Sequence, residues 1–234
     1  MDKKIAVMFS GGKDSCYALQ SVLKTDPIEF MISVISDNGD THLHAGPEID
    51  SGLRQIQLEL LGLPYKIVKV GSGENYLHEL FVALNKLVKE NGITHLVTGD
   101  LWHPYTTGIG DMLAGALGVK IIRPAREACA SRSEDTAFME KVLASGVRSV
   151  IISVRDGDLP KEYVGREIDE PLIQKLVSLG VDAAAEGGEY QSFVVSCPLM
   201  KNQIVIDDFR VDLVDGKNGK ERFHRMFVNR YHVV

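Results

Sequence analysis

Ile5-Ala6-Val7-Met8-Phe9-Ser10-Gly11-Gly12-Lys13-Asp14-Ser15 is the stretch that best defines the architecture of this chain of 234 residues. The apolar run from Ile5 to Phe9 is typical of a buried parallel strand. The residues after it carry apolar side chains at helical spacing, at Cys16, Leu19, Val22 and Leu23. The segment therefore predicts a strand, a glycine-rich turn and a helix in succession.

The turn from Ser10 to Ser15 has the chemistry of a phosphate site. A helix N-terminus presents free backbone N–H groups and the positive end of the helix dipole. Glycines let the backbone approach a ligand closely and adopt positive φ, and Lys13 adds a point charge suited to a polyphosphate. We therefore predict as nucleotide-binding residues Ser10, Gly11, Gly12, Lys13, Asp14 and Ser15.

Two common nucleotide-binding patterns do not fit this turn. G-x-x-x-x-G-K-[ST] would require Gly in place of Val7 and Ser or Thr in place of Asp14, and G-x-G-x-x-G is also absent here. The SGGKDS turn instead resembles the pyrophosphate-binding loop of the N-type ATP pyrophosphatases. That resemblance implies that ATP, with Mg²⁺, is split into AMP and pyrophosphate while a substrate is adenylated.

Composition narrows the class of protein. The apolar fraction of 44% supports a substantial core, and a net charge of −6 argues against a broad nucleic-acid-binding face. Cys16, Cys129 and Cys197 have neither zinc-site nor disulfide-framework spacing. No apolar stretch has the form of a signal peptide or the length of a membrane span. We expect a cytoplasmic protein without nucleic-acid or membrane partners, and the oligomeric state stays open.

Strand-like and helix-like segments alternate through the first two thirds of the chain. The predicted strands are Ile5–Phe9, Phe30–Ile35, Tyr65–Val70, His95–Thr98, Lys120–Ile122 and Ser149–Val154. The predicted helices are Asp14–Lys24, Glu48–Leu61, Glu74–Asn91, Gly108–Leu117, Glu134–Ala144 and Asp169–Leu179. This alternation predicts an α/β fold with a doubly wound parallel sheet, whose ligands bind at the carboxyl ends of the strands.

The pattern becomes rich in strands after Gly187. The predicted strands there are Ser192–Ser196, Gln203–Ile206, Arg210–Val214 and Arg222–Val228. We place a domain boundary near Pro124, where the alternation loosens. The prediction is an ATP-binding domain over residues 1–123 and a smaller α+β substrate-binding domain over residues 124–234.

A second motif, Glu186-Gly187-Gly188-Glu189-Tyr190, begins the strand-rich part. Two acids flank a Gly-Gly turn in which the backbone can approach a ligand closely. Carboxylates can hold Mg²⁺ or an ammonium ion. The alternative interpretation is a solvated turn that carries two surface acids.

The two motifs together resemble the diphthine–ammonia ligase family. The resemblance rests on SGGKDS, on EGGEYQSFV followed by Cys197-Pro198-Leu199, and on Thr98-Gly99-Asp100 and the Gly165–Asp169 segment between them. It implies an ATP-binding sheet domain of the adenine nucleotide alpha hydrolase type, with a substrate domain that carries the EGGE loop. The implied reaction amidates diphthine, a modified histidine of translation elongation factor 2, with ammonium and ATP.

The resemblance also assigns roles to residues. Beyond the loop, it implies nucleotide contacts at His44, Gly99 and Asp100. It implies acceptor or ammonium contacts at Glu186, Gly187, Gly188, Glu189 and Tyr190. The catalytic residues are then Lys13, Asp14, Glu186 and Glu189.

The expected mechanism needs no protein nucleophile. The acceptor carboxylate attacks the α-phosphorus of ATP, and ammonia then displaces AMP from the acyl-adenylate, so positioning and electrostatics carry the rate. Three alternatives stay open: a tRNA-modifying ATP pyrophosphatase, a ligase for another carboxylate, and a non-catalytic adenine-nucleotide sensor. The acidic balance and scattered cysteines disfavour the first, and the intact Lys13-Asp14 pair disfavours the sensor.

Overall fold

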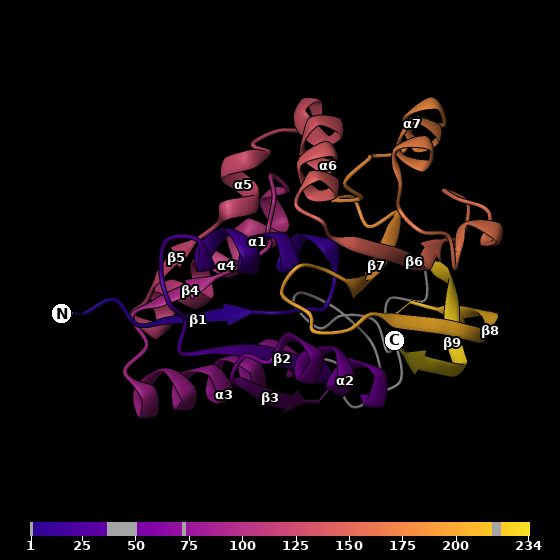
Figure 1. The fold of residues 1–234 in the computed structure, drawn as a ribbon. Coiled ribbons are helices and arrows are strands. Elements are labelled where there is room, and N and C mark those ends of the chain that lie inside the picture. The colour runs from indigo at the N-terminus through magenta and orange to yellow at the C-terminus, as the bar shows by residue number, and fades with distance from the viewer. Residues whose placement is uncertain (1, 37–50, 72–73, 217–220) are drawn as a thin grey trace.

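Two sheets organise the chain in the computed structural model, which describes residues 2–36, 51–71, 74–216 and 221–234 (Figure 1). The N-terminal sheet has five parallel strands in the order β3-β2-β1-β4-β5. The C-terminal sheet has four antiparallel strands in the order β7-β6-β9-β8. This arrangement confirms the predicted α/β class with a smaller, strand-rich C-terminal part.

The parallel sheet places the SGGKDS turn at its centre. Its strands are β1 (Ile5–Met8), β2 (Phe30–Ser36), β3 (Tyr65–Val70), β4 (His95–Val97) and β5 (Lys120–Ile122). Strand β1 pairs with β2 on one side and with β4 on the other, so the strand order reverses beside it. Such a reversal opens a crevice at the carboxyl ends of the strands, where the turn lies.

Helices cover both faces of this sheet. They are α1 (Lys13–Leu23), α2 (Ser51–Leu61), α3 (Tyr76–Asn91), α4 (Pro104–Leu117) and α5 (Pro124–Ala128). Alternate residues of the first strand face opposite ways: Ile5 and Val7 share a core with α1 and α2, whereas Ala6 and Met8 share one with α3 and α4. Burial on both faces explains why the strand is apolar throughout.

The C-terminal part holds its own helices and longer strands. The helices are α6 (Asp135–Ala144) and α7 (Glu170–Ser178), and the strands are β6 (Arg148–Arg155), β7 (Tyr190–Ser196), β8 (Ile204–Asp215) and β9 (Arg222–Val233). The two strands predicted at Gln203–Ile206 and Arg210–Val214 are therefore one strand. Register shifts between Ile206 and Phe209 let β8 continue through the polar residues that separated them in the sequence pattern.

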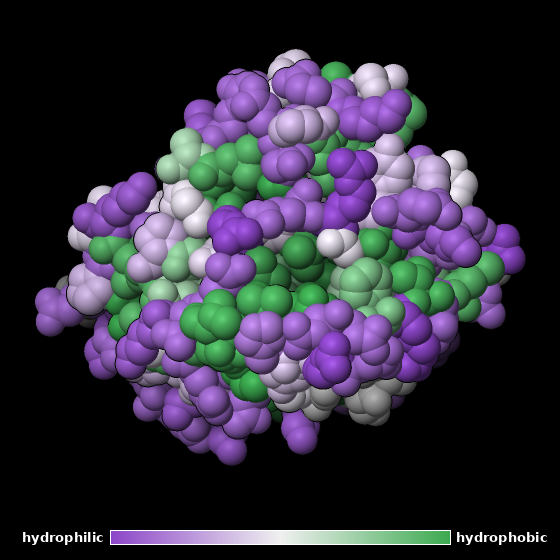
Figure 2. Space-filling view, turned by 45° about the vertical axis from the view of Figure 1, so that its right-hand side comes forward, coloured by the Kyte–Doolittle hydropathy of each residue, from purple (hydrophilic) through white to green (hydrophobic). Residues whose placement is uncertain are grey.

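The two parts share one hydrophobic core. It includes Leu19 of α1, Phe138 of α6, and Phe193 and Met226 of the C-terminal sheet. The boundary between residues 123 and 124 stays a prediction. The face of the molecule seen in Figure 2 is largely hydrophilic, with a band of apolar residues across its middle. Within the described ranges, no helix combines the length and the apolar character needed to cross a membrane.

Candidate functional site

The SGGKDS turn closes on itself at the carboxyl end of β1. The Ser10 hydroxyl donates to Ser15 Oγ at 3.0 Å, and Ser15 Oγ donates to the Gly12 carbonyl at 3.0 Å. Gly11 has a φ of 83°, and a side chain there would clash with Gln57 of α2. The sequence therefore needs Gly at this position both for the backbone conformation and for the contact with α2.

Three separate motifs meet around one pocket of about 140 Å³ beside this turn. Its lining residues are Met8, Ser10, Asp14, Ser15, Gly99, Asp100, Thr106 and Glu186. SGGKDS, Thr98-Gly99-Asp100 and the first acid of the EGGE motif thus converge, although more than 170 residues separate the first from the last. The predicted site residue His44 lies outside the described residues.

Lys13 turns away from this pocket and into the C-terminal part. Its side chain is only 3% exposed, and Nζ donates to Asp14 Oδ2 at 2.8 Å and to the Ala184 carbonyl at 2.6 Å. The ammonium also lies 5.4 Å from the centre of the Tyr190 ring. Burial alone would lower the pKa of Lys13, but Asp14 and Tyr190 outweigh that effect and raise the pKa above its ordinary value. Lys13 therefore links the start of α1 to the loop that precedes β7 through a charged hydrogen bond.

Glu186 is the acid that enters the pocket. Its Oε1 accepts hydrogen bonds from Thr106 Oγ1 at 3.1 Å and from the Leu101 N–H at 3.3 Å. Burial, together with the nearby Asp14 carboxylate, raises the pKa of Glu186 to about 7. A carboxyl that titrates near neutral pH is suited to take or give a proton during catalysis.

Glu189 does not line the pocket, although it belongs to the same motif. Its Oε2 is buried and has no hydrogen-bond partner among the residues that the structure describes, and burial raises its pKa. The reversal of direction at Gly188, where φ is 80°, separates the two acids. Tyr190 is buried and donates to the Ala183 carbonyl at 2.6 Å. Within the EGGE motif, only Glu186 reaches the pocket.

A buried ion pair supports the Asp100 side of the pocket. Thr98 Oγ1 donates to Asp100 Oδ2 at 2.9 Å, and Arg123 Nε lies 3.5 Å from the same oxygen. Arg123 also contacts Asp111 at 2.8 Å. Sequence reasoning missed Arg123, and its place directly after a predicted strand could have indicated it. Gly99 has no room for a side chain, because a Cβ there would lie 2.7 Å from the Ser15 nitrogen.

Strand β7 is attached to the phosphate loop through backbone and side-chain hydrogen bonds. The Val194 N–H donates to the Gly11 carbonyl at 2.9 Å. Gln57 Nε2 donates to both the Gly11 and the Val194 carbonyls, at 3.0 and 2.7 Å. The Lys13 N–H donates to Ser192 Oγ at 3.2 Å. Gln57 and Ser192 therefore support the phosphate loop, and neither was among the site residues predicted from the sequence.

The residues at the pocket fit a magnesium ion that is shared with nucleotide phosphates. Asp14 Oδ1 is buried and has no hydrogen-bond partner among the described residues. Within those residues, no cluster of three or more Asp, Glu, His or Cys side chains could hold a metal by itself. Magnesium commonly binds through one or two carboxylates with phosphate oxygens and waters, which is the arrangement that a single orphan carboxylate oxygen fits.

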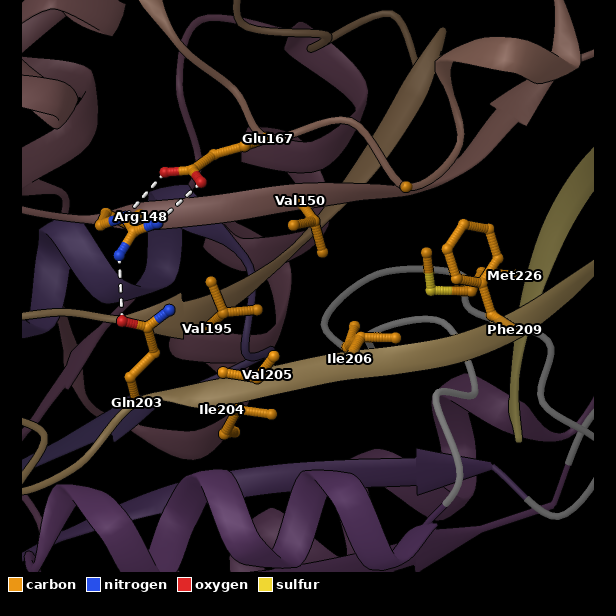
Figure 3. Close-up of a pocket in the computed structure, with 11 residues that line it drawn as sticks. Arg148, Val150, Glu167, Val195, Gln203, Ile204, Val205, Ile206, Phe209 and Met226 are labelled. Carbon is orange, nitrogen blue, oxygen red and sulfur yellow. Dashed lines mark hydrogen bonds and ion pairs between the residues drawn. The ribbon is translucent and has the colours of Figure 1, made fainter. Parts of the chain in front are cut away.

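A second hollow of about 140 Å³ lies within the C-terminal sheet, and it lacks free reactive groups (Figure 3). Its lining is mostly apolar, including Ile206 and Phe209. Its charged groups satisfy one another: Arg148 makes a two-point ion pair with Glu167 at 2.7 and 2.8 Å and donates to Gln203 at 3.0 Å. We therefore assign the reactive site to the pocket beside the phosphate loop.

Comparison with known proteins places both halves of the chain in one family. Residues 3–121 match the family model of the diphthamide synthase N-terminal domain, and residues 134–226 match that of the C-terminal domain. Diphthine–ammonia ligase of Mus musculus is 28% identical over 229 residues, which cover 87% of this chain and 83% of that protein. The Homo sapiens protein of the same name is 25% identical over 233 residues, covering 89% and 84%.

Among solved structures, a protein described as a predicted subunit of tRNA methyltransferase from Methanocaldococcus jannaschii DSM aligns with 84% of this chain and 98% of its own. Its TM-score is 0.44 and its sequence identity is 16%. A similarity of this size supports no functional statement.

Proposed function

Because the chain belongs to the diphthamide synthase family, we propose that it is an ATP-dependent ligase that amidates diphthine with ammonia and releases AMP and pyrophosphate. The observation that supports this function best is the meeting of the SGGKDS turn and Glu186 at one pocket. A phosphate loop is suited to adenylation, and a carboxyl with a pKa of about 7 is suited to proton transfer from ammonium.

ATP binds with its β- and γ-phosphates on the turn from Ser10 to Ser15. The backbone N–H groups and the N-terminal end of α1 stabilise negative charge on the leaving pyrophosphate. Lys13 contributes its positive charge from behind the turn, where Asp14 and the Ala184 carbonyl hold it. Asp14 would hold Mg²⁺ through Oδ1, and the ion would neutralise phosphate charge.

In the first step, the diphthine carboxylate attacks the α-phosphorus. A carboxyl oxygen–phosphorus bond forms, and the bond from that phosphorus to pyrophosphate breaks. The protein contributes position and charge, because no covalent bond to a side chain is needed.

In the second step, ammonia attacks the acyl carbon and AMP leaves with the electron pair of the carbon–oxygen bond. Ammonium must lose one proton before it attacks and a second as the amide forms. Glu186 accepts the first of these protons, since its carboxyl titrates near neutral pH and lies in the pocket, and the phosphate of the departing AMP accepts the second. Glu189 lies outside the pocket, so we assign it to contact with the acceptor protein rather than to proton transfer.

We assign elongation factor 2 that carries diphthine as the acceptor and the cytoplasm as the location. The test mixes the purified chain with that acceptor, ATP and isotopically labelled ammonium. We expect the label in the acceptor, with AMP and pyrophosphate as products that depend on the acceptor. ADP as the main nucleotide product would overturn the mechanism. AMP release driven by tRNA would favour the tRNA-modifying alternative, and ATP binding without turnover would favour the sensor.

A further inference from the structure

Two buried carboxyl groups, Asp135 and Asp182, meet behind the turn that carries Glu186. Asp135 is the first residue of α6, and Asp182 follows α7. They are 4% and 3% exposed, and their side chains are hydrogen-bonded to each other. Neither lines the pocket beside the phosphate loop. The mechanism described above therefore leaves this pair unused.

Asp182 holds the backbone of the turn. Its Oδ1 accepts hydrogen bonds from the Ala184 N–H at 2.9 Å and from the Ala185 N–H at 3.2 Å. Ala185 has a φ of 58°, which makes it the sole non-glycine residue with positive φ in the part of the chain that the structure describes. An alanine stays in this conformation only where its surroundings impose it, and the two backbone N–H groups that donate to Asp182 do so here.

The same turn supplies the backbone carbonyls that accept hydrogen bonds from Lys13 and from Tyr190. The Ala184 carbonyl accepts from Lys13 Nζ at 2.6 Å, and the Ala183 carbonyl accepts from the Tyr190 hydroxyl at 2.6 Å. Glu186 follows Ala185 directly and enters the pocket. A change in the conformation of the turn would therefore move Glu186 and release Lys13 together.

Asp135 completes the support from the other side. Its Oδ1 accepts from the Trp102 indole N–H at 2.8 Å and from the Cys129 thiol at 3.4 Å. Two buried carboxyl groups in contact do not both ionise readily, so Asp135 tends to keep its proton beside Asp182. Burial first, and then Asp182, raises the pKa of Asp135 to about 7.

Other charged and titratable groups lie near Asp135 and Asp182, on the segments that pack against them. On the Asp182 side these groups are Asp14, Glu189 and Tyr190. On the Asp135 side, Cys129 and Glu134 are adjacent, and Arg132 lies at a hollow of about 220 Å³ that reaches the pair.

We propose that Asp135 and Asp182 are positioning residues that act as a hydrogen-bonded carboxyl pair. The pair holds the turn from Ala183 to Glu186 in one conformation. In that conformation Glu186 enters the pocket and the Ala184 carbonyl accepts a hydrogen bond from Lys13. The proposal rests on the proposed role of Glu186 in proton transfer. Loss of the Asp135 proton leaves two facing carboxylates, and the turn then relaxes. An amide can replace either acid: at position 135 it donates to Asp182 and accepts from the Trp102 indole, and at position 182 it donates to Asp135 and accepts from the Ala184 and Ala185 N–H groups.

The test compares substitutions that keep or remove the hydrogen bonds. Asp135→Asn and Asp182→Asn keep them, so we expect amidation close to that of the wild type at neutral pH. Asp135→Ala and Asp182→Ala remove them, and we expect kcat to fall by about 100-fold, as for a misplaced catalytic group, with the KM for ATP little changed. Glu140→Gln, at an exposed position of the same helix, is the matched control and should behave as wild type.

A readout that does not depend on activity is the pH titration of the Ala184 and Ala185 amide proton resonances. In the Glu186→Gln background, which removes the titration of the neighbouring Glu186 carboxyl, we expect both to shift with an apparent pKa of about 7, and in Asp135→Asn/Glu186→Gln we expect that transition to disappear. If the wild type does not amidate diphthine at all, this titration still tests the pair, so failure of the proposed function is distinguishable. If Asp182→Ala does not fold, Asp182→Asn decides.

Two results would overturn the proposal. One is equal damage from Asp135→Asn and Asp135→Ala in kcat, which would mean that the hydrogen bonds are not what matters. The other is a folded Asp182→Ala variant with unchanged Ala184 and Ala185 resonances and wild-type kcat.

Discussion

Replacing Lys13 by Met should destabilise the fold as well as abolish turnover. The ammonium is 3% exposed and makes charged hydrogen bonds of 2.8 and 2.6 Å to Asp14 and to the Ala184 carbonyl. Methionine fills much of the same volume but leaves both acceptors without their donor. Removal of one partner of a buried ion pair typically costs about 3–5 kcal/mol, and the lower end applies here because the remaining Asp14 side chain is 27% exposed and is partly solvated.

That cost sets the size of the expected change in thermal stability. For a chain of about this length, 1 kcal/mol shifts Tm by roughly 2–4 °C, so a loss of about 3 kcal/mol should make the variant unfold about 6–12 °C below the wild type. The loss is smaller than the total stability of most proteins, about 5–15 kcal/mol, so the variant should remain largely folded at 25 °C. The predicted contact of Lys13 with the nucleotide accounts for the loss of ATP cleavage, and the burial of Lys13 adds the loss of stability.

The assay is thermal unfolding followed by circular dichroism, beside acceptor-dependent AMP release. The double variant Lys13→Met/Asp14→Asn leaves no charge buried at this place, so it should recover part of the stability, with a coupling of about 0.5–3 kcal/mol. It should remain inactive. An unchanged Tm for Lys13→Met would refute the view that Lys13 stabilises the contact between α1 and the loop that precedes β7. Additive effects of the two substitutions on stability would refute an energetic coupling between Lys13 and Asp14.

Three further predictions concern the acids and the glycines. Glu186→Gln should lower amidation by about 10²–10³-fold with ATP affinity measured by calorimetry nearly unchanged, and Glu189→Gln should have a smaller effect; equal losses would contradict the placement of these acids. Gly99→Ala should weaken ATP binding strongly because its Cβ meets backbone 2.7 Å away, whereas Gly115→Ala, with open space, should bind normally. Wild-type stability should fall more than that of Asp135→Asn as pH rises from about 4 to about 7, because the folded state keeps that proton longer; parallel unfolding curves would contradict this.

The fold was predictable because its signals are local. Each strand of the parallel sheet is a short apolar run, and Ile5–Phe9 gave both the central strand and the start of the site. The error at Gln203–Val214 has a physical cause. In the continuous strand β8, polar residues such as Asp207 and Asp208 point outward around a register shift, and the sequence pattern cannot distinguish that from a loop.

The site was predictable only in part, because some of its members come together through tertiary contacts. SGGKDS carries its chemistry within six residues. Gln57, by contrast, contacts Val194 across 137 positions, and nothing near Gln57 in the sequence indicates that contact. Glu186 enters the pocket and Glu189 does not, because of the backbone conformation of the turn between them. The sequence pattern of two acids around Gly-Gly does not specify that conformation.

The hydrogen bonds between β7 and the phosphate loop bear on how these proteins can be recombined. Because the Gly11 carbonyl is satisfied by Val194 and by Gln57, the nucleotide half of the chain is incomplete without the strand that follows the EGGE motif. Chimaeras that join the first half of one relative to the second half of another would place unmatched side chains at this seam. Laboratory evolution of a new acceptor specificity in the C-terminal half would therefore carry a constraint from ATP binding, and compensating changes should appear at positions such as Gln57 and Ser192.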